Sequence, residues 1–334
     1  MLSAMSVSHT TGSIVFFAAV LIIAAAATAY AAAWIGRKLN CRREPQRSAL
    51  AKWTRRDVLA LAGGGAGCII WGAFFEPYRL EITRTRVVSS KLRGAERPVR
   101  IVHISDLHCD PKARNEPKLP GEIRDLRPDL IVYTGDSINS LGGLSNFRRC
   151  LTEIAEIAPT YVTRGNWDRY FGRVDFFGNT GVTELDGANE RVMAAGTSLW
   201  VAGAAVMDHL QPHQAAEFLD ETVEGMPEDE FRLFLYHYPD LIYSLVDRKI
   251  DLHCSGHTHG GQVAMPFYGA LLTASQYGKK FEAGLYRPGP NTHLYVTRGI
   301  GMEGNAPRVR FCCRPEISLI EIAPDGVSAT GERG

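Results

Sequence analysis

The chain repeatedly places a short hydrophobic run directly ahead of a glycine or of residues that bind metals. The run at 99–104 is followed by Asp106 and His108, and later runs end in Gly135-Asp136, Gly165-Asn166, His237 and Gly256-His257-Thr258-His259. In an extended strand, residues i and i+2 point the same way, so Asp106 and His108 present a carboxylate and an imidazole to one point. Proteins of the α/β class carry their chemistry at the carboxyl ends of strands. The pattern therefore predicts one site assembled from several strand ends.

The candidate ligands combine imidazoles with carboxylate and amide oxygens: Asp106, His108, Asp136, Asn166, His237, His257 and His259. This mixture suits Mn²⁺, Fe or Zn²⁺ better than Ca²⁺, which prefers oxygen ligands alone. Seven ligands are too many for one ion and fit two ions that share a carboxylate. Two cations about 3.5–4 Å apart can hold the attacking and leaving oxygens of a phosphoryl displacement. We therefore predict two divalent metal ions. His103, His209, His213, His253 and His293 are interpreted as structural histidines with satisfied hydrogen bonds.

Apolar runs and helical periodicity alternate from residue 97 onward. Strands are predicted at 99–104, 130–133, 160–163, 199–206, 233–236, 251–254, 293–297 and 317–322, and helices at 147–157, 215–223 and 241–246. The early crossovers are long enough for parallel βαβ units, whereas the later strands are closely spaced and can pair antiparallel. Two sheets packed face to face, with helices outside, account for this mixture.

The order of these motifs resembles the calcineurin-like metallophosphoesterase family over residues 97–322. The stretch Gly256 to Gln262 and the later Thr297-Arg298-Gly299-Ile300-Gly301 are similar to its bacterial membrane-associated branch. The resemblance implies a four-layer α/β/β/α double sandwich and a metal-bound hydroxide as the nucleophile. It assigns Asp106, His108 and His259 to the first metal, assigns Asn166, His237 and His257 to the second, and makes Asp136 the bridge.

One position departs from the family motif. Where the family has Gly-Asn-His-Asp/Glu, this chain reads Gly165-Asn166-Trp167-Asp168. The family histidine protonates the leaving oxygen, and an indole N–H cannot act as a general acid. Either another residue supplies the proton, or the leaving group needs none, as for a nucleotide expelled from a pyrophosphate. The family's UDP-2,3-diacylglucosamine hydrolases resemble this case, because an important branch also lacks the histidine.

The remaining polar residues of this motif complete the predicted site. Arg164 and Arg169 flank it and could bind phosphate oxygens bidentately, although a solvated arginine is the competing interpretation. We take Asp136, Asp168 and Arg164 as the catalytic candidates.

Residues 1–96 are interpreted as a membrane anchor. The run 14–35 has 22 residues without a charge, enough to span the roughly 30 Å hydrocarbon core. A basic loop, 37–56, carries eight Lys and Arg against the single acid Glu44, and a second apolar run follows at 58–75. The second run is either a plain anchor helix or part of a twin-arginine export signal, since it follows Arg55 and Arg56. We thus expect one or two N-terminal transmembrane helices.

The basic loop sets the expected topology. Loops rich in Lys and Arg stay in the cytoplasm, so the catalytic domain, 97–322, is expected on the outer, periplasmic face of the inner membrane. Residues 323–334 are predicted to form a flexible tail. The seven cysteines show no Cys-x-x-Cys spacing and fit neither a disulfide framework nor a zinc ribbon.

Three functions remain open. The first is a membrane-anchored phosphoesterase acting on a lipid-linked or small phosphorylated substrate, with UDP-2,3-diacylglucosamine in lipid A biosynthesis as the most specific choice. The second is a broad-specificity, outward-facing phosphodiesterase or phosphatase. The third is a metal-binding scaffold whose catalysis Trp167 impairs, which an intact ligand set disfavours. A net charge of +1 argues against a nucleic-acid substrate, and no obligatory protein partner is evident.

Overall fold

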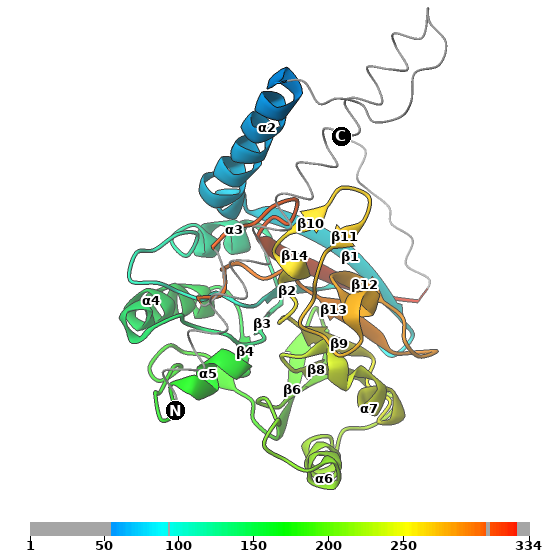
Figure 1. Ribbon diagram of the computed structural model, residues 1–334. Helices are drawn as coiled ribbons and strands as arrows, with labels where there is room; N and C mark the ends of the chain where they lie inside the picture. Colours follow the sequence, from blue (N-terminus) through cyan, green and yellow to red (C-terminus); the bar gives the residue numbers. More distant parts are fainter. Residues whose placement is uncertain (1–54, 93, 305–307, 326–334) are drawn as a thin grey trace, which may run out of the picture.

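The computed structural model describes residues 55–92, 94–304 and 308–325 (Figure 1). Its framework is two six-stranded sheets. The first sheet has the order β1 (Glu81–Ser89), β14 (Glu316–Pro324), β2 (Val99–Ile104), β3 (Leu130–Tyr133), β4 (Thr160–Val162) and β5 (Thr183–Glu184). The second has the order β12 (Gly284–Tyr286), β13 (His293–Val296), β9 (Leu252–Ser255), β8 (Phe231–Leu235), β7 (Thr197–Gly203) and β6 (Ala188–Ala194).

Both sheets mix parallel and antiparallel pairs. Strands β2 to β5 are parallel, and so are β13, β9, β8 and β7. Antiparallel pairs occur at β14–β2, β12–β13 and β6–β7. A small antiparallel hairpin, β10 (Ala264–Met265) with β11 (Gly269–Ala270), follows β9. The prediction of a mixed α/β fold with parallel and antiparallel strands is confirmed.

Hydrophobic side chains fill the space between the sheets and cover both outer faces. Ile101 and Val132 of the first sheet share one cluster with Val201 and Leu233 of the second. The outer face of the first sheet packs against α3 (Leu119–Asp125) and α4 (Leu144–Ala155), and that of the second against α6 (Pro212–Thr222) and α7 (Ile242–Asp247). Because most central strands are buried on both faces, they read in the sequence as continuous apolar runs.

Strand β1 begins before the boundary at residue 97 that the sequence suggested. It pairs in parallel with β14 over nine positions, from Glu81–Glu316 to Ser89–Pro324, so the first sheet extends back to Glu81. Exposed and partly buried residues alternate along most of β1, because only one face of this edge strand is covered. In the sequence, Arg84 and Arg86 look like the charged end of the preceding apolar run, so the strand was not predicted.

Helix α2 (Arg55–Phe74) projects from the domain beside α3 and β1 (Figure 1). It forms where a second membrane-spanning run was predicted at 58–75, but within the described ranges no helix is both long and apolar enough to cross a membrane. The transmembrane helix predicted at 58–75 is therefore not confirmed. Three predicted segments lie wholly or mostly outside the described residues: the first span at 14–35, the basic loop at 37–56 and the tail at 323–334.

Candidate metal centre

The seven predicted ligands follow the carboxyl ends of five strands. Asp106 and His108 follow β2, Asp136 follows β3, His237 follows β8, and His257 and His259 follow β9. Asn166 opens the short helix α5 (Asn166–Tyr170) just after β4. Five of these residues have positive φ: Asp106 at 53°, His108 at 42°, Asp136 at 62°, His257 at 70° and His259 at 51°. Non-glycine residues rarely adopt this conformation, and its clustering is typical of functional sites.

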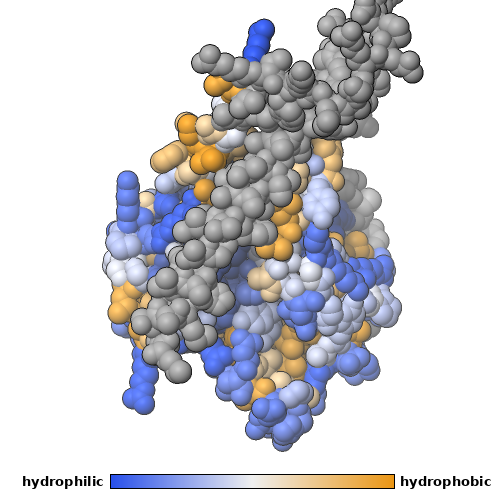
Figure 2. All heavy atoms as spheres, in the orientation of Figure 1, coloured by the Kyte–Doolittle hydropathy of each residue, from blue (hydrophilic) through white to orange (hydrophobic). Residues whose placement is uncertain are grey.

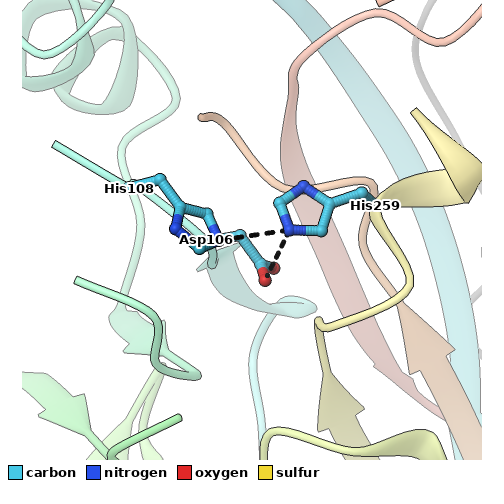
Figure 3. Close-up of side chains that lie close together, drawn as sticks. All are labelled: Asp106, His108 and His259. Carbon is cyan, nitrogen blue, oxygen red and sulfur yellow. Dashed lines mark hydrogen bonds and ion pairs between the residues drawn. The ribbon is translucent and has the colours of Figure 1, made fainter. Parts of the chain in front are cut away.

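The first cluster joins Asp106, His108 and His259, whose side chains point toward one another (Figure 3). The Nε2 atoms of His108 and His259 lie 3.2 Å apart, and His259 Nε2 lies 3.3 Å from Asp106 Oδ1. All three residues are buried. Two nitrogens and a carboxylate oxygen thus converge on one point, as the ligands of a single cation do.

The second cluster joins Asp136, His237 and His257. Asp136 Oδ2 lies 3.2 Å from His237 Nε2 and 3.5 Å from His108 Nε2, so one carboxylate oxygen faces both clusters. Asn166 lies beside it, because the next residue, Trp167, donates its backbone N–H to Asp136 Oδ1 at 2.8 Å. This is the arrangement that a carboxylate shared by two ions requires.

Hydrogen bonds fix which ring nitrogen three of the histidines offer. His237 Nδ1 lies 2.6 Å from the Thr134 carbonyl, and His108 Nδ1 lies 3.1 Å from Asn139 Oδ1, so each ring presents Nε2 to the site. His257 is reversed: its Nε2 donates to the Ala274 carbonyl at 3.1 Å and leaves Nδ1 free. Such outer partners orient metal-binding imidazoles.

Two buried polar atoms support the fit to a metal. Asn166 Oδ1 is buried and accepts no hydrogen bond within the described part of the chain, and the buried His237 Nε2 makes none there but lies 3.2 Å from the Asp136 carboxylate. Unpaired buried polar groups are unfavourable, so a cation at this point would satisfy both. Carboxylate, amide and imidazole donors together suit a divalent transition metal.

Burial is the largest influence on the ionisation of these groups. It raises the pKa of Asp106 to about 7, and it lowers the pKa of His108 to about 4 and that of His257 to about 3. His237 and Asp136 are the exceptions: Asp136 and Asp106 outweigh burial and raise the pKa of His237 to about 9, and the neighbouring histidines, His237 foremost, outweigh burial and lower the pKa of Asp136 to about 2. Most of these imidazoles are therefore neutral at pH 7, which is the form that binds a metal.

The side chains of Asp168 and Arg164, two of the predicted catalytic residues, are both engaged by other parts of the chain. The Asp168 carboxylate is buried and accepts the backbone N–H groups of Gly165, Asp136 and Ser137 at 2.8 to 3.0 Å. The Arg164 guanidinium donates to Glu184, with Nε 2.5 Å from Oε1. Arg169 is exposed. Asp168 thus joins two ligand-bearing loops, and Arg164 is held by an acidic partner.

Sequence reasoning missed the residues that support the histidines. Asn139 contacts the ring of His108, and its amide also donates to the carbonyls of His108 and Met302 at 2.8 and 3.0 Å. Arg310 is fully buried, with Nη2 3.4 Å from His259 Nδ1 and 2.6 Å from the Gly301 carbonyl. The Thr297 to Gly301 motif was a signal for this second region, but nothing in the sequence identified Arg310.

Comparison with known proteins decides the family. Residues 99–261 match the family model described as calcineurin-like phosphoesterase. The uncharacterized metallophosphoesterase YkuE of Bacillus subtilis (strain 168) is 30% identical over 278 residues, which cover 78% of this chain and 91% of that protein. The chain belongs to the calcineurin-like phosphoesterase family. It is therefore a metal-dependent phosphoesterase, and the resemblance inferred from the motifs is confirmed.

Other relatives carry more specific names. Phosphodiesterase YaeI of Escherichia coli (strain K12) is 30% identical over 262 residues, covering 75% of this chain and 90% of that protein. UDP-2,3-diacylglucosamine pyrophosphatase LpxG of Chlamydia trachomatis serovar D is 26% identical over 307 residues, covering 75% of this chain and 92% of that protein. Among solved structures, TT1561 of Thermus thermophilus matches with a TM-score of 0.43 at 11% identity over 61% of this chain and 90% of that chain.

Proposed function

We propose that this phosphoesterase hydrolyses a phosphodiester or pyrophosphate bond in a lipid-linked substrate, with UDP-2,3-diacylglucosamine as the first compound to test. The observation that carries the proposal is the paired cluster around Asp136 together with Trp167 in the position of the family histidine. The name of the LpxG relative supports the choice of substrate.

Two divalent ions, when bound, supply positive charge that activates water and neutralises phosphate oxygens. Asp106, His108 and His259 would hold one ion, Asn166, His237 and His257 would hold the other, and Asp136 would contact both. The chain's own contribution is to fix these side chains before a substrate arrives. Thr134, Asn139 and Ala274 set the ring nitrogens, and Asp168 holds the backbone of the Asp136 and Gly165 loops.

The proposed location is the membrane. Placing the catalytic domain on the outer face requires residues 58–75 to cross the membrane after residues 14–35, because the basic loop between the two runs stays in the cytoplasm. The uncharged sequence 14–35 supports this location. Exposed apolar side chains at the end of α2, among them Ile70, Phe74 and the following Phe75, add to it (Figure 2). A reporter fused after Gly334 that is active only outside the membrane is expected to be active. Activity of a reporter that works only inside would instead place the domain in the cytoplasm.

The substrate is tested with the full chain, saturated with Mn²⁺, on UDP-2,3-diacylglucosamine, bis-p-nitrophenyl phosphate and p-nitrophenyl phosphate in parallel. We expect the pyrophosphate to be hydrolysed fastest. Asp136→Asn should remove nearly all activity on every substrate, whereas the matched Asp175→Asn, in an exposed loop, should remove none. More than about a tenth of wild-type activity in Asp136→Asn would contradict the bridging role.

A second candidate is a phosphodiesterase of broad specificity, which the name of the YaeI relative favours. It predicts that bis-p-nitrophenyl phosphate is hydrolysed as fast as the lipid nucleotide. Hydrolysis of the model diester with no activity on UDP-2,3-diacylglucosamine would decide for this candidate.

A further inference from the structure

Two segments far apart in the sequence carry clusters of exposed apolar side chains. One is the end of α2 with the residue after it, and the other is the hairpin of β10 and β11 with the residues that follow. Single exposed apolar residues are normal on a protein surface, whereas clusters mark contact surfaces. The six side chains that form what we call the apolar face are Ile70, Phe74, Phe75, Phe267, Tyr268 and Leu272.

Phe267, in the turn between β10 and β11, is held in an unfavourable conformation. Its φ is 67°, a region that bulky residues rarely adopt, and its ring is fully exposed. Packing within the described part of the chain therefore does not offset the strain. Residues held in such conformations cluster at positions that serve a function. The tip of the hairpin is thus built to contact something outside the fold.

Backbone hydrogen bonds join the two segments into one face. The Arg310 N–H donates to the carbonyl of Gly72 in α2 at 2.9 Å. The next residue, Phe311, accepts the N–H of Ala264 in β10 at 2.8 Å and donates to the Gln262 carbonyl at 2.9 Å. The hairpin and α2 accordingly lie on the same side of the domain (Figure 1). One flat surface can therefore meet both.

Each segment also places a cation over an aromatic ring. The Arg79 guanidinium lies 5.4 Å from the centre of the Trp71 ring, and Lys279 Nζ lies 3.4 Å from the centre of the Tyr268 ring. Trp and Tyr are enriched at the headgroup layer of membranes, and Lys and Arg near this layer are attracted to anionic lipids. Protein interfaces, in contrast, are depleted in lysine. This composition favours a lipid surface over a protein partner.

The sequence on either side agrees with a lipid surface. Residues 263–281 contain two lysines and no Asp or Glu, so no negative charge opposes an anionic bilayer. The chain ahead of α2 contains the uncharged run 14–35, whose 22 residues are enough to span the hydrocarbon core. A bilayer is therefore the expected neighbour of α2, and the hairpin lies on the same side.

The base of the hairpin packs against the loop that carries His257 and His259. A Cβ on Gly261 would stand 2.6 Å from the Ala270 Cβ, so the hairpin lies close against this loop. Past the hairpin, the Ala274 carbonyl accepts the hydrogen bond from His257 Nε2 at 3.1 Å. A bilayer that takes up the hairpin tip would therefore lie beside the metal centre.

We propose that the apolar face is a membrane-binding surface, in which the ring of Phe267 enters the same lipid leaflet as the end of α2. Lys279 and Lys280 then lie at the headgroups, and the metal centre is held close to substrates in that leaflet. The proposal rests on the membrane location proposed above, and not on the identity of the substrate.

The test uses the full chain reconstituted into vesicles of phosphatidylethanolamine and phosphatidylglycerol. The photoreactive residue p-benzoylphenylalanine takes the place of Phe267 in one protein and of Met193 in another. Met193 is also exposed, but it lies on β6, the edge strand of the second sheet farthest from β12. After irradiation, mass spectrometry should find lipid crosslinked at position 267 and none at position 193.

A second measurement tests the contribution of the Phe267 ring itself. With the photoreactive residue at position 272, Phe267→Asp should lower lipid crosslinking by about tenfold or more, because burial of a phenylalanine ring is worth at least this factor. Met193→Asp is the matched control and should not change it. Hydrolysis of soluble bis-p-nitrophenyl phosphate should stay within about twofold of wild type in both variants, which shows that each is folded.

Flotation of the vesicles separates the possible failures. Chain that floats with the vesicles but gives no lipid crosslink at position 267, or equal crosslinks at 267 and 193, would overturn this proposal alone. A crosslink at 267 to a second copy of the chain would also overturn it and would identify a protein interface. Chain that does not float would overturn the membrane location together with this proposal.

Discussion

Asp168 connects two of the loops that carry predicted ligands. Its buried carboxylate accepts N–H groups from Gly165 on one side and from Asp136 and Ser137 on the other. An asparagine here can accept with only one oxygen, so at least one buried N–H loses its partner. Such supporting residues commonly affect metal affinity by about 10–100-fold when they are changed.

We therefore predict that Asp168→Asn raises the Mn²⁺ concentration for half-maximal activity by about 10–100-fold, with kcat largely recovered at saturating metal. Asp175→Asn is the control, because Asp175 also accepts a backbone N–H, from Gly178 at 2.8 Å, but in an exposed loop. An unchanged Mn²⁺ requirement in Asp168→Asn would show that the loops hold their positions without it.

The residue scale also shows what a motif can and cannot predict. Asp106, His108 and Asp136 were predictable, because a strand end forces neighbouring polar side chains toward one edge. The direction of Arg164 was not, since its partner Glu184 lies 20 positions away and the contact exists only in the folded chain. The same holds for Asn139, which meets His108 across 31 positions.

Buried histidines outside the metal centre give a pH-dependent stability. Burial lowers the pKa of His253 to about 3. In the unfolded chain this pKa is about 6.5. Between these values the unfolded state binds a proton that the folded state excludes, so stability is complete above about pH 6.5 and is lost as pH falls.

The expected loss from His253 between about pH 7.5 and 5.5 is about 1.4 kcal/mol. His253→Leu should remove this contribution, whereas His103, whose pKa burial also lowers to about 3, should keep its own. Urea unfolding at the two pH values, in the presence of chelator, measures the difference. An identical pH dependence in wild type and variant would contradict the assignment.

At the scale of elements, the end of α2 is tied to the segment that supports His259. Arg310 donates its N–H to the Gly72 carbonyl at 2.9 Å, and Glu76 accepts the N–H of Cys313 at 3.0 Å. Cys313 in turn donates its thiol to the His259 carbonyl at 3.0 Å. A Cβ on Gly72 would stand 3.0 Å from the Arg310 carbonyl oxygen, whereas one on Gly64 would meet nothing within 4 Å.

The same substitution at these two glycines distinguishes the packing of α2 against residues 310–313 from the intrinsic effect of valine in a helix. Gly72→Val should destabilise the fold by about 1–3 kcal/mol through overpacking and speed hydrogen exchange of the Arg310 N–H. Gly64→Val, in the same helix, should do neither. Both are measured by thermal unfolding and exchange mass spectrometry. Equal effects at the two positions would mean that the contact between α2 and residues 310–313 does not contribute to stability.

Elements were predictable where burial is complete on both faces. The runs at 99–104 and 130–133 match β2 and β3 to the residue, because continuous hydrophobic runs of this length have few alternatives in an α/β protein. Strand β1 was not predicted, because most of one face is exposed and carries Arg84 and Arg86. Helix α2 was predictable as a helix, but its hydrophobicity suggested a span.

At the scale of the whole molecule, the predicted metal ligands come from both sheets. His237, His257 and His259 follow strands of the second sheet, and the other four ligands follow strands of the first. Bound metal would therefore link the two sheets across the core. A ligand that binds only the folded state stabilises it by RT ln(1 + [L]/Kd), about 2.7 kcal/mol at a concentration of about 100 Kd.

Protons compete with the metal for the same atoms. Asp136 and Asp106 raise the pKa of His237 to about 9 despite burial, so the metal-free site holds a proton on His237 at pH 7. Metal must displace that proton, and its affinity should fall as pH falls below about 9. The stability gained from metal should therefore be smaller at pH 6 than at pH 8, at equal Mn²⁺ concentration.

We predict that chelation lowers the unfolding temperature, that Mn²⁺ restores it, and that Mn²⁺ binding at pH 7 in weak buffer releases protons. His237→Ala should remove most of the stabilisation by Mn²⁺ and release fewer protons, because the displaced proton resides on that ring. His213→Ala, at an exposed position of α6, is the control and should behave as wild type. Calorimetry in two buffers of different ionisation enthalpy counts the protons. If chelation and Mn²⁺ left the unfolding temperature unchanged, the ions could not be holding the two sheets together.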